Sequence, residues 1–451
     1  MKKKEHRQFL NYVSDIVILL VEVSMFAFAW YVYYSPLIAE FGRGFNVRGN
    51  YVLIGLYLLL AFFFTKNFGG YRMGMSKNNE LLISNLLAIF ATNFGGYIMI
   101  LLVGRRYMEI GVWPLLLLIV FQALFVIIWL KLFGVLYNKK YPARQALLIY
   151  GNYSPDSFIS KIEDRNDKFI ICETLDSEVA LESLKKQMLS RQLIILYGVP
   201  SQKRNELIKY AYSKDLLIYT TPTVSDILIS SSERIHLFDT PLLCHKTHVM
   251  TLSERVIKRV LDIVVASIAL IISSPLFIIL SVIIKLNDGG RVFFLQERYT
   301  ALKKVFTIIK FRSMEEKSEE KWTEKNQDSN PKVTKIGNVM RRTHIDELPQ
   351  FINILRGEMS LVGPRAEWKD VADEYEKEFP EFRFRYKVKA GLTGYAQVYG
   401  KYDTTAFNKL KLDLYYIENY SIWLDLKLIL LTLKVLFLKD ETQGIRKKNN
   451  D

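Results

Sequence analysis

The chain has 451 residues, of which half are hydrophobic, and its formal net charge is +15. This composition argues against an ordinary soluble protein and is typical of a protein that lies partly in lipid. A basic chain can bind nucleic acid or an anionic membrane surface. We favour the membrane, and expect no nucleic acid partner, because the lysines and arginines lie beside hydrophobic segments. The two cysteines, Cys172 and Cys244, fit neither a metal motif nor a disulfide framework.

Four apolar stretches open the chain, at residues 15–35, 51–64, 81–103 and 112–136. Most approach the roughly 20 residues that span a bilayer, so residues 1–140 are predicted to form four transmembrane helices. Basic residues before the first stretch and after the fourth place both ends of this region in the cytoplasm. Inside the first stretch, Glu22 is either a functional carboxylate or a neutral residue between helices, and we favour the second interpretation.

Residues 141–250 are predicted to form a Rossmann-like α/β domain. Apolar runs at 146–150, 169–173, 193–197 and 216–219 indicate strands, and helical patterns such as 201–213 lie between them. A dinucleotide site needs a glycine-rich loop after the first strand. Here Gly151-Asn152-Tyr153-Ser154-Pro155 supplies a single glycine. We therefore expect this domain to have a structural or regulatory role.

A fifth apolar stretch, residues 261–284, is interrupted by Ser273-Ser274-Pro275. It is either a fifth crossing with a proline kink or a re-entrant helix that breaks at Pro275 and returns to the same face. We favour the re-entrant helix because basic residues flank both ends, with Ser274 satisfying a backbone group freed at the break. Residues 251–451 would then be this helix and a small monotopic α/β domain in the cytoplasm, with residues 415–438 along the bilayer surface. The segments 315–331 and 439–451 are polar and predicted to be a loop and a loose tail.

Two adjacent carboxylates, Asp346 and Glu347, follow the Arg341-Arg342 pair. Pro349 has no N–H to donate, so it belongs in the first turn of the next helix, and this spacing favours Asp346 as the N-cap. The helix is predicted to end near Gly357. Its N-terminus and Arg341 would hold the carboxylates ionised. The alternative is that Asp346 only caps the helix and Glu347 only complements its dipole.

Four motifs follow one another in the last third of the chain. They are Lys310-Phe311-Arg312-Ser313-Met314, Asp346-Glu347-Leu348-Pro349-Gln350, Leu361-Val362-Gly363-Pro364-Arg365 and Gly391-Leu392-Thr393-Gly394-Tyr395-Ala396-Gln397-Val398. In this order they resemble the bacterial sugar transferase family, the polyprenyl-phosphate glycosyl-1-phosphate transferases, over roughly residues 255–437. The preceding spans and α/β domain resemble the long members of that family. Tyr299, Ala366 and Ala390 stand at positions where prolines are usual in the family.

The resemblance implies a reaction and a set of site residues. A sugar 1-phosphate would pass from a UDP-sugar to undecaprenyl phosphate at the cytoplasmic face of the bacterial plasma membrane, and UMP would leave. Asp346 would be the nucleophile, and Glu347 would help to hold Mg²⁺. The predicted substrate-binding residues are Lys310, Arg312, Arg341, Arg365 and Gln397. The family also has a re-entrant helix with a Ser-Pro break, which falls here on Ser274 and Pro275.

Other interpretations stay open. The two carboxylates could form a purely metal-binding site, with direct attack by the lipid and no covalent enzyme. The chain could also be a non-catalytic scaffold for polysaccharide assembly, or a membrane oxidoreductase or epimerase that uses the α/β domain. The intact Asp346-Glu347 pair argues against the scaffold, and the missing glycine loop argues against the oxidoreductase. A homo-oligomer is compatible with the sequence.

Overall fold

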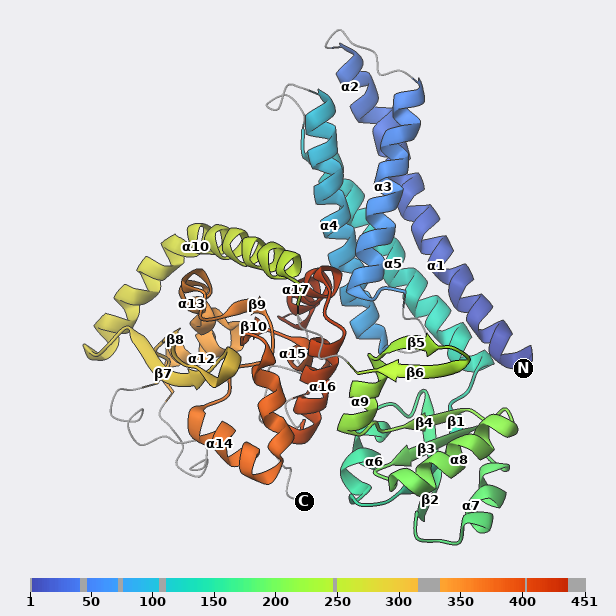
Figure 1. Cartoon of the computed structure of the whole chain (residues 1–451). Coiled ribbons are helices and arrows are strands. Elements are labelled where there is room, and N and C mark those ends of the chain that lie inside the picture. Colours follow the sequence, from blue (N-terminus) through green and yellow to red (C-terminus); the bar gives the residue numbers. More distant parts are fainter. Residues whose placement is uncertain are drawn as a thin grey trace. The chain divides into compact units, whose positions relative to one another are not determined.

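The computed structural model describes residues 2–40, 47–71, 76–104, 111–245, 250–314, 333–401 and 404–436. The chain divides into two compact units, Met1–Pro222 and Thr223–Asp451, and each is described by itself (Figure 1). The loop predicted at 315–331 and the tail predicted at 439–451 lie outside the described residues.

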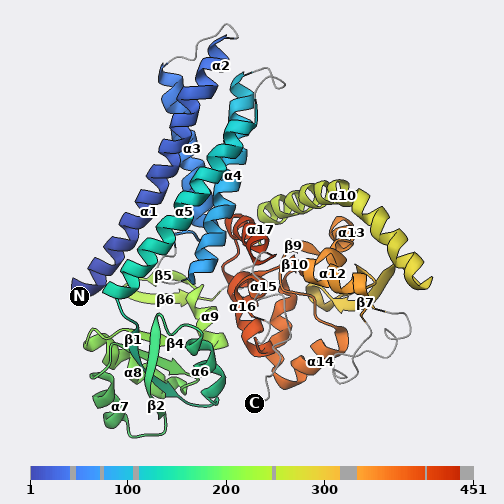
Figure 2. The ribbon, with the colours of Figure 1, turned by 180° about the vertical axis from the view of Figure 1, so that it is seen from behind.

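The first unit opens with long apolar helices, seen from opposite sides in Figures 1 and 2. They are α1 (Lys2–Ala29), continued by the π-helical turn η1 (Trp30–Tyr34) and α2 (Ser35–Glu40), then α3 (Val47–Phe68), α4 (Asn78–Gly104) and α5 (Trp113–Lys140). Among the described residues of this unit, four segments are long and apolar enough to cross a membrane: 9–39, 48–68, 78–103 and 113–140. These segments are longer than the predicted apolar stretches because the helices continue into the polar residues at the ends of each stretch. These helices fit a membrane protein, and the number of actual crossings stays a prediction.

A buried polar network joins the helices of this bundle. The Tyr57 hydroxyl donates to Asn93 Oδ1 at 3.1 Å, and Asn93 Nδ2 donates to Gln122 Oε1 at 2.7 Å. Gln122 Nε2 in turn donates to the backbone oxygen of Glu22 at 3.0 Å. Side-chain hydrogen bonds of this kind hold apolar helices together in lipid. Glu22 itself is buried inside the bundle, which fits its interpretation as a residue between helices.

The α/β part of the first unit has a four-stranded parallel sheet in the order β2-β1-β3-β4. Its elements are β1 (Arg144–Tyr150), α6 (Asp156–Glu163), β2 (Phe169–Asp176), α7 (Leu181–Met188), β3 (Leu193–Tyr197), α8 (Ser201–Ser213) and β4 (Ile218–Thr220). The central strands β1 and β3 are buried over most of their length, as runs of Leu and Ile require. The predicted parallel α/β arrangement is therefore confirmed, whereas its Rossmann-like assignment stays a prediction.

The crevice between the ends of β1 and β3 is where such sheets bind ligands. Gly151 approaches Gly198 so closely there that a Cβ atom on Gly151 would collide with the Gly198 carbonyl oxygen. The ring of Tyr153 lies against Gly198 and faces Tyr197. An aromatic side chain thus stands where a dinucleotide phosphate would need open backbone amides. The structural or regulatory role expected of this domain stays a prediction.

The second unit begins earlier in the chain than the predicted boundary near residue 251. Its first elements are α9 (Val224–Ser230) and the antiparallel hairpin of β5 (Glu233–Leu237) and β6 (Thr240–Cys244). Ile227 of α9 belongs to the hydrophobic core of this unit, and the Ser231 hydroxyl donates to Glu418 Oε2 at 3.3 Å. The compact unit that holds the α/β sheet therefore ends at Pro222 and not near residue 250, because Ile227 of α9 packs into the core of the second unit.

Helix α10 (Leu252–Asp288) contains the fifth apolar stretch. A straight helix of its 37 residues would be roughly 55 Å long, against about 30 Å for the hydrocarbon core of a bilayer. Figure 1 shows that its ribbon changes direction along its length. The helix continues across Pro275, so the predicted break is a bend. Pro275 cannot donate to the Ile271 carbonyl, and the Ser274 hydroxyl donates to that oxygen instead at 2.8 Å.

The remaining elements fold beneath α10. They are β7 (Phe293–Tyr299), η2 (Ala301–Lys303), β8 (Val305–Phe311), α12 (Lys335–Thr343), η3 (Ile345–Glu347), α13 (Gln350–Arg356), β9 (Ser360–Val362), α14 (Lys369–Glu378), η4 (Pro380–Lys387), β10 (Gly391–Thr393), α15 (Tyr395–Tyr399), α16 (Ala406–Glu418) and α17 (Ile422–Leu436). Strands β7 and β8 form an antiparallel hairpin, and β9 pairs with β10 in parallel. The core between them includes Ile354, Leu410, Leu414 and Leu428, which are fully buried.

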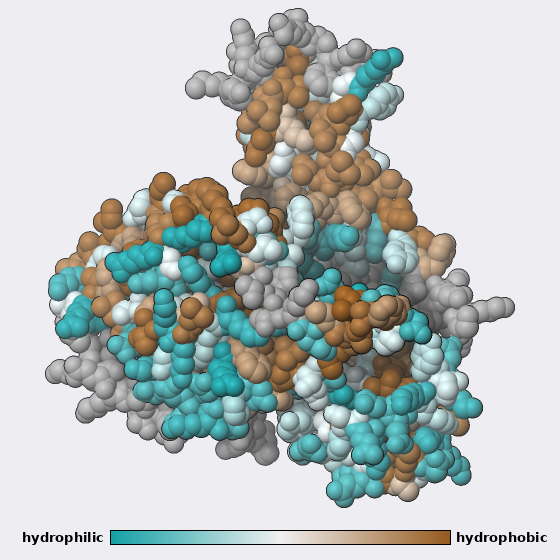
Figure 3. All heavy atoms as spheres, in the orientation of Figure 1, coloured by the Kyte–Doolittle hydropathy of each residue, from teal (hydrophilic) through white to brown (hydrophobic). Residues whose placement is uncertain are grey.

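Charged residues near the start of α10 fix it to the elements below. Lys258 Nζ donates to Asp425 Oδ2 of α17 at 2.6 Å and to the Val362 oxygen at 3.0 Å. Asp262 Oδ1 accepts hydrogen bonds from the Ser360 hydroxyl and the Leu361 N–H. Farther along, α10 exposes isoleucines, and Figure 3 shows hydrophobic surface over this helix. One helix therefore combines an apolar outer face with a polar attachment to β9.

Candidate active site

The turn that carries the two carboxylates differs from the predicted helix cap. Helix α12 ends at Thr343, and His344 adopts a left-handed conformation with φ of 55°. Asp346 and Glu347 then lie in the 3₁₀ turn η3, and Pro349 is the N-cap of α13. The prediction that Asp346 caps this helix is wrong: after the left-handed His344 the chain forms η3, and the cap of α13 is Pro349, three residues after Asp346. Helix α13 does end at Gly357, with φ of 83°, as predicted.

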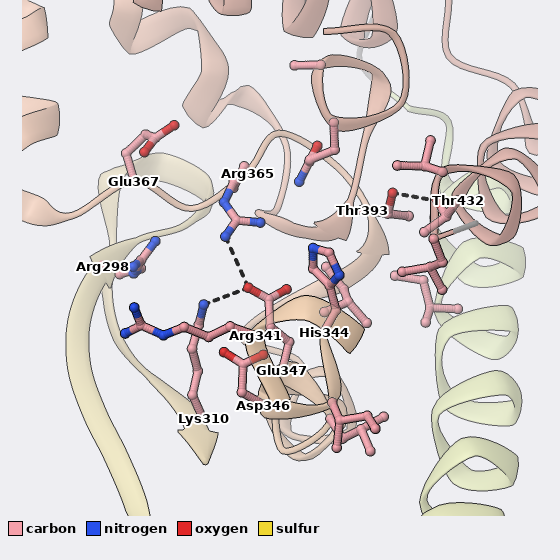
Figure 4. A pocket seen from close by; sticks show the side chains of 18 of the residues that line it. Arg298, Lys310, Arg341, His344, Asp346, Glu347, Arg365, Glu367, Thr393 and Thr432 are labelled. Atoms are coloured by element: carbon pink, nitrogen blue, oxygen red, sulfur yellow. Dashed lines mark hydrogen bonds and ion pairs between the residues drawn. The ribbon is translucent and has the colours of Figure 1, made fainter. Parts of the chain in front are cut away.

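Glu347 is held by two cations from different elements. Its Oε1 accepts hydrogen bonds from Lys310 Nζ of β8 at 2.7 Å and from Arg365 Nη2 at 3.0 Å (Figure 4). Burial alone would raise the pKa of Glu347, but Lys310 and Arg365 outweigh burial and hold that pKa far below its usual value. Glu347 is therefore ionised at neutral pH.

Asp346 has the opposite electrostatic environment. Burial and the neighbouring charge of Glu347 raise the pKa of Asp346, and Lys310 and Arg341 oppose this only in part. The expected cause, a helix N-terminus together with Arg341, is therefore wrong for Glu347, whose pKa is lowered by Lys310 and Arg365. For Asp346, Arg341 lowers the pKa as expected but offsets only part of the rise. Two adjacent carboxylates whose pKa values move apart are typical of sites in which each has a separate role.

Two buried arginines position the loop that carries Arg365. Arg298 of β7 donates to the Ala366 carbonyl oxygen, and Arg385 Nη2 donates to the Arg365 carbonyl oxygen at 2.8 Å. Arg385 is itself fixed by Asp413 Oδ2 of α16 at 2.7 Å. Because both arginines hold backbone atoms, the side chain of Arg365 remains directed at Glu347.

A cavity of about 1,340 Å³ collects most of the predicted site residues. Its lining includes Lys310, Arg341, Asp346, Glu347, Arg365 and Gln397. Arg341 Nε donates to the Ser313 hydroxyl at 2.8 Å, and Figure 4 shows Arg341 beside Lys310 and Asp346. Arg312 does not line this cavity and is buried. Strand β8 ends at Phe311, so the strand alternation that would place residues 310 and 312 on one face no longer applies.

The cavity also contains residues that the sequence did not single out. His344 and Thr393 lie in or beside quoted motifs, and their position there was a usable signal. Thr432 lies in the apolar helix α17, where nothing in the local pattern indicates a site. Further apolar lining comes from two helices: Val265 of α10 and Ile429, Leu433 and Leu436 of α17.

A divalent metal could be held here by few protein ligands. Among the described residues, no group of three or more His, Cys, Asp or Glu side chains is placed to bind a metal. Mg²⁺ is usually bound by one or two carboxylates together with water and substrate phosphates. An ionised Glu347 beside Asp346 fits that kind of site.

Comparison with known proteins identifies the family. The family described as "Bacterial sugar transferase" matches residues 253–439, which contain every predicted site residue. The exopolysaccharide production protein ExoY of Rhizobium meliloti (strain 1021) is 36% identical over 197 residues, covering 40% of this chain and 85% of that protein. This chain belongs to the bacterial sugar transferase family. The carboxylate pair and its cations thus lie in the part that this bacterial sugar transferase shares with its relatives.

Two longer relatives carry more explicit names. The chain is 42% identical over 183 residues to the UDP-N-acetylgalactosamine-undecaprenyl-phosphate N-acetylgalactosaminephosphotransferase of Aeromonas hydrophila, covering 40% of this chain and 43% of the relative. It is 38% identical over 203 residues to the UDP-glucose:undecaprenyl-phosphate glucose-1-phosphate transferase of Escherichia coli (strain K12), covering 44% and 42% respectively. The matched region therefore spans less than half the length of these two relatives.

Proposed function

We propose that this bacterial sugar transferase moves a sugar 1-phosphate from a UDP-sugar to undecaprenyl phosphate and releases UMP. The reaction would begin the synthesis of an exopolysaccharide, capsule or O-antigen. The observation that carries the proposal is the carboxylate pair in the 3₁₀ turn, with Lys310, Arg341 and Arg365 around it in one large cavity. The names of the relatives in Aeromonas hydrophila and Escherichia coli support the same substrate classes.

Asp346 is the proposed nucleophile. Its carboxylate oxygen attacks the β-phosphorus of the UDP-sugar, the bond to the bridging oxygen breaks, and UMP leaves with that oxygen. The sugar phosphate is then held on Asp346 as an acyl phosphate, and a phosphate oxygen of the lipid attacks the same phosphorus and restores the carboxylate. Covalent catalysis of this kind divides one difficult transfer into two easier steps. Asp346 is available for the reaction because Pro349, not Asp346, is the helix cap.

The surrounding cations would bind the diphosphate. Arginine forks and a lysine ammonium form charge-assisted hydrogen bonds to phosphate oxygens, and these strengthen as charge builds up on the departing UMP. Lys310 and Arg365 share Glu347 Oε1, which fixes their positions before substrate arrives. Pre-positioned cations need little reorganisation during the reaction.

Mg²⁺ is the proposed cofactor. Glu347, whose low pKa keeps it ionised, would hold the ion together with the phosphates of the substrate. When bound, the metal would neutralise part of the diphosphate charge.

The membrane part of the proposal concerns α10. We infer that it enters the lipid, bends at Pro275 and returns to the cytoplasmic face of a bacterial plasma membrane. Its exposed isoleucines on both sides of Pro275, Ile271, Ile272, Ile278 and Ile279, support contact with lipid. Its attachment to β9 through Asp262 supports a catalytic domain at the membrane surface, where a lipid phosphate can reach it.

Release of UMP tests this function. The full-length protein in native-lipid particles is incubated with undecaprenyl phosphate, Mg²⁺ and a panel of UDP-sugars, and UMP is measured. We expect UMP from at least one sugar and none from Asp346→Asn. A folded wild-type protein that releases no UMP from any sugar would support the scaffold alternative.

A further inference from the structure

The cavity has two chemically different sides around the carboxylate pair. Figure 4 shows Lys310 and Arg298 on one side of Glu347, and Thr393 and Thr432 on the opposite side, beyond His344. The cationic side suits the phosphates of the proposed substrate. In a UDP-sugar, the sugar is attached to the β-phosphorus on the side away from the nucleotide. With the phosphates on the cationic side, the sugar ring would therefore lie on the threonine side.

The two threonines form a hydrogen-bond chain whose direction can be deduced. Thr393 Oγ1 and Thr432 Oγ1 are 2.6 Å apart, and Thr432 Oγ1 is also 2.7 Å from the Leu428 carbonyl oxygen. A hydroxyl has one proton to donate, and a carbonyl oxygen can only accept. The Thr432 proton therefore points to Leu428, and the Thr393 proton points to Thr432. Thr393 Oγ1 can therefore accept a further hydrogen bond but cannot donate one.

Because Thr393 Oγ1 can only accept, it can bind only those substrate groups that donate a hydrogen bond. Phosphate oxygens at neutral pH are acceptors, and an isoprenoid chain offers neither donor nor acceptor. Ring hydroxyls and an acetamido N–H of a sugar are donors. The ribose hydroxyls and the uracil N–H are donors too, but they are attached through the α-phosphorus, at the other end of the diphosphate from the sugar. Thr393, which is buried in the cavity wall, is thus complementary to the sugar and not to the phosphates.

A second polar group lies four residues after Thr393, in the helix α15 that follows β10. The side-chain amide of Gln397 in α15 is buried, and neither its nitrogen nor its oxygen has a hydrogen-bond partner among the described residues. A buried polar group without a partner is unfavourable, so a ligand that supplies partners gains affinity. Gln397 can donate and accept, which matches a hydroxyl that does both.

We propose that Thr393 and Gln397 form a sugar-recognition subsite that reads a hydroxyl or acetamido group of the donor sugar, with Thr432 as the positioning residue that orients the Thr393 hydroxyl. This proposal rests on the proposed function, because it assigns the sugar of the UDP-sugar to the side of the cavity that Thr393 and Gln397 line. A site built to bond one hydroxyl discriminates strongly against an analogue that lacks it.

The test measures kcat/KM for UMP release from the best natural UDP-sugar and from a series of its analogues. In each analogue one hydrogen-bond donor of the sugar is replaced, a hydroxyl by fluorine or an acetamido group by an acetoxy group. These replacements can accept a hydrogen bond but cannot donate one. For the wild-type enzyme, one analogue should lose about 10- to 100-fold. Thr393→Val should lose a similar factor on the natural sugar and no more than about twofold further on that analogue. Thr432→Val should reduce the same discrimination, and Thr432→Ser should restore it because the hydroxyl is kept.

Thr343→Val is the matched control. Thr343 lines the same cavity, but its hydroxyl donates to the Val339 oxygen of its own helix, so its loss should leave the analogue profile unchanged. If Thr393→Val lowers kcat/KM by one common factor for every analogue, Thr393 reads no sugar group and the subsite is refuted. If the valine variants do not fold, the wild-type profile still decides, because equal rates for all analogues would refute the subsite. Absence of UMP from every UDP-sugar would instead contradict the proposed function.

Discussion

Parallel strands end beside closely approaching glycines in two regions of this molecule. In the first unit, Gly151 after β1 meets Gly198 after β3; in the second, Gly363 after β9 meets Gly394 after β10. The first crevice receives the ring of Tyr153, whereas the second leads to the cavity that Asp346 and Glu347 line. Similar backbone geometry thus carries different side chains in the two regions. We infer that these side chains, and not the fold, decide the role of each region.

The largest effect is expected from Asp346→Asn. An amide is not a nucleophile, so UMP release should fall by about three orders of magnitude or more. Thermal unfolding should change little, because Asp346 caps no helix. Asp370→Asn is a control for the loss of one acidic charge, since Asp370 is exposed on α14. Near-normal turnover by the Asp346 variant would remove the basis of the nucleophile assignment.

Glu347→Gln should produce a smaller but still severe defect, of about 100-fold in kcat. The amide cannot balance Lys310 and Arg365, and it is a poor ligand for Mg²⁺. Added Mg²⁺ should relieve the defect only in part. Full recovery at high Mg²⁺ would show that Glu347 serves only the metal and does not also position the cations.

A matched pair of glycine variants tests the comparison of the two strand ends directly. Gly363→Ala would bring a Cβ atom against the Lys389 carbonyl oxygen, and Gly151→Ala would bring one against the Gly198 carbonyl oxygen. Both should lower the unfolding temperature. Only Gly363→Ala should also lower kcat, by about tenfold or more, since it displaces Arg365 and Thr393 on either side. Equal activity losses in the two variants would make the α/β crevice part of the catalytic machinery.

The smallest effect is expected from removing the first unit. A protein that starts at Thr223 keeps α9 and its core residue Ile227, and it should release UMP at a rate within about tenfold of the full chain. A start at residue 251 deletes this packing, so that version should be less stable. If the Thr223 version is folded and membrane-bound but inactive, and adding the first unit restores it, the site is shared between the units.

The sequence predicts regular elements well where one local pattern dominates. Runs of Leu and Ile predicted β1 and β3, and the order of the motifs identified Asp346 and Glu347 as a pair. The left-handed residue His344 could not be predicted, because it is not a glycine, and it changed the cap assignment. The attachment of α9 to the second unit and the approach of Thr432 to Thr393 depend on contacts between residues far apart in sequence, which no local pattern contains.

The most direct test of the central claim is a search for the covalent sugar phosphate on Asp346. The protein is incubated with its best UDP-sugar and Mg²⁺ without undecaprenyl phosphate, stopped rapidly, digested and analysed by mass spectrometry. The covalent mechanism predicts up to one UMP per protein molecule and a sugar-phosphate mass on the peptide that contains Asp346, absent from Asp346→Asn. UMP that forms only when the lipid is present, with no modified peptide under any condition, would contradict it and establish direct attack by the lipid phosphate.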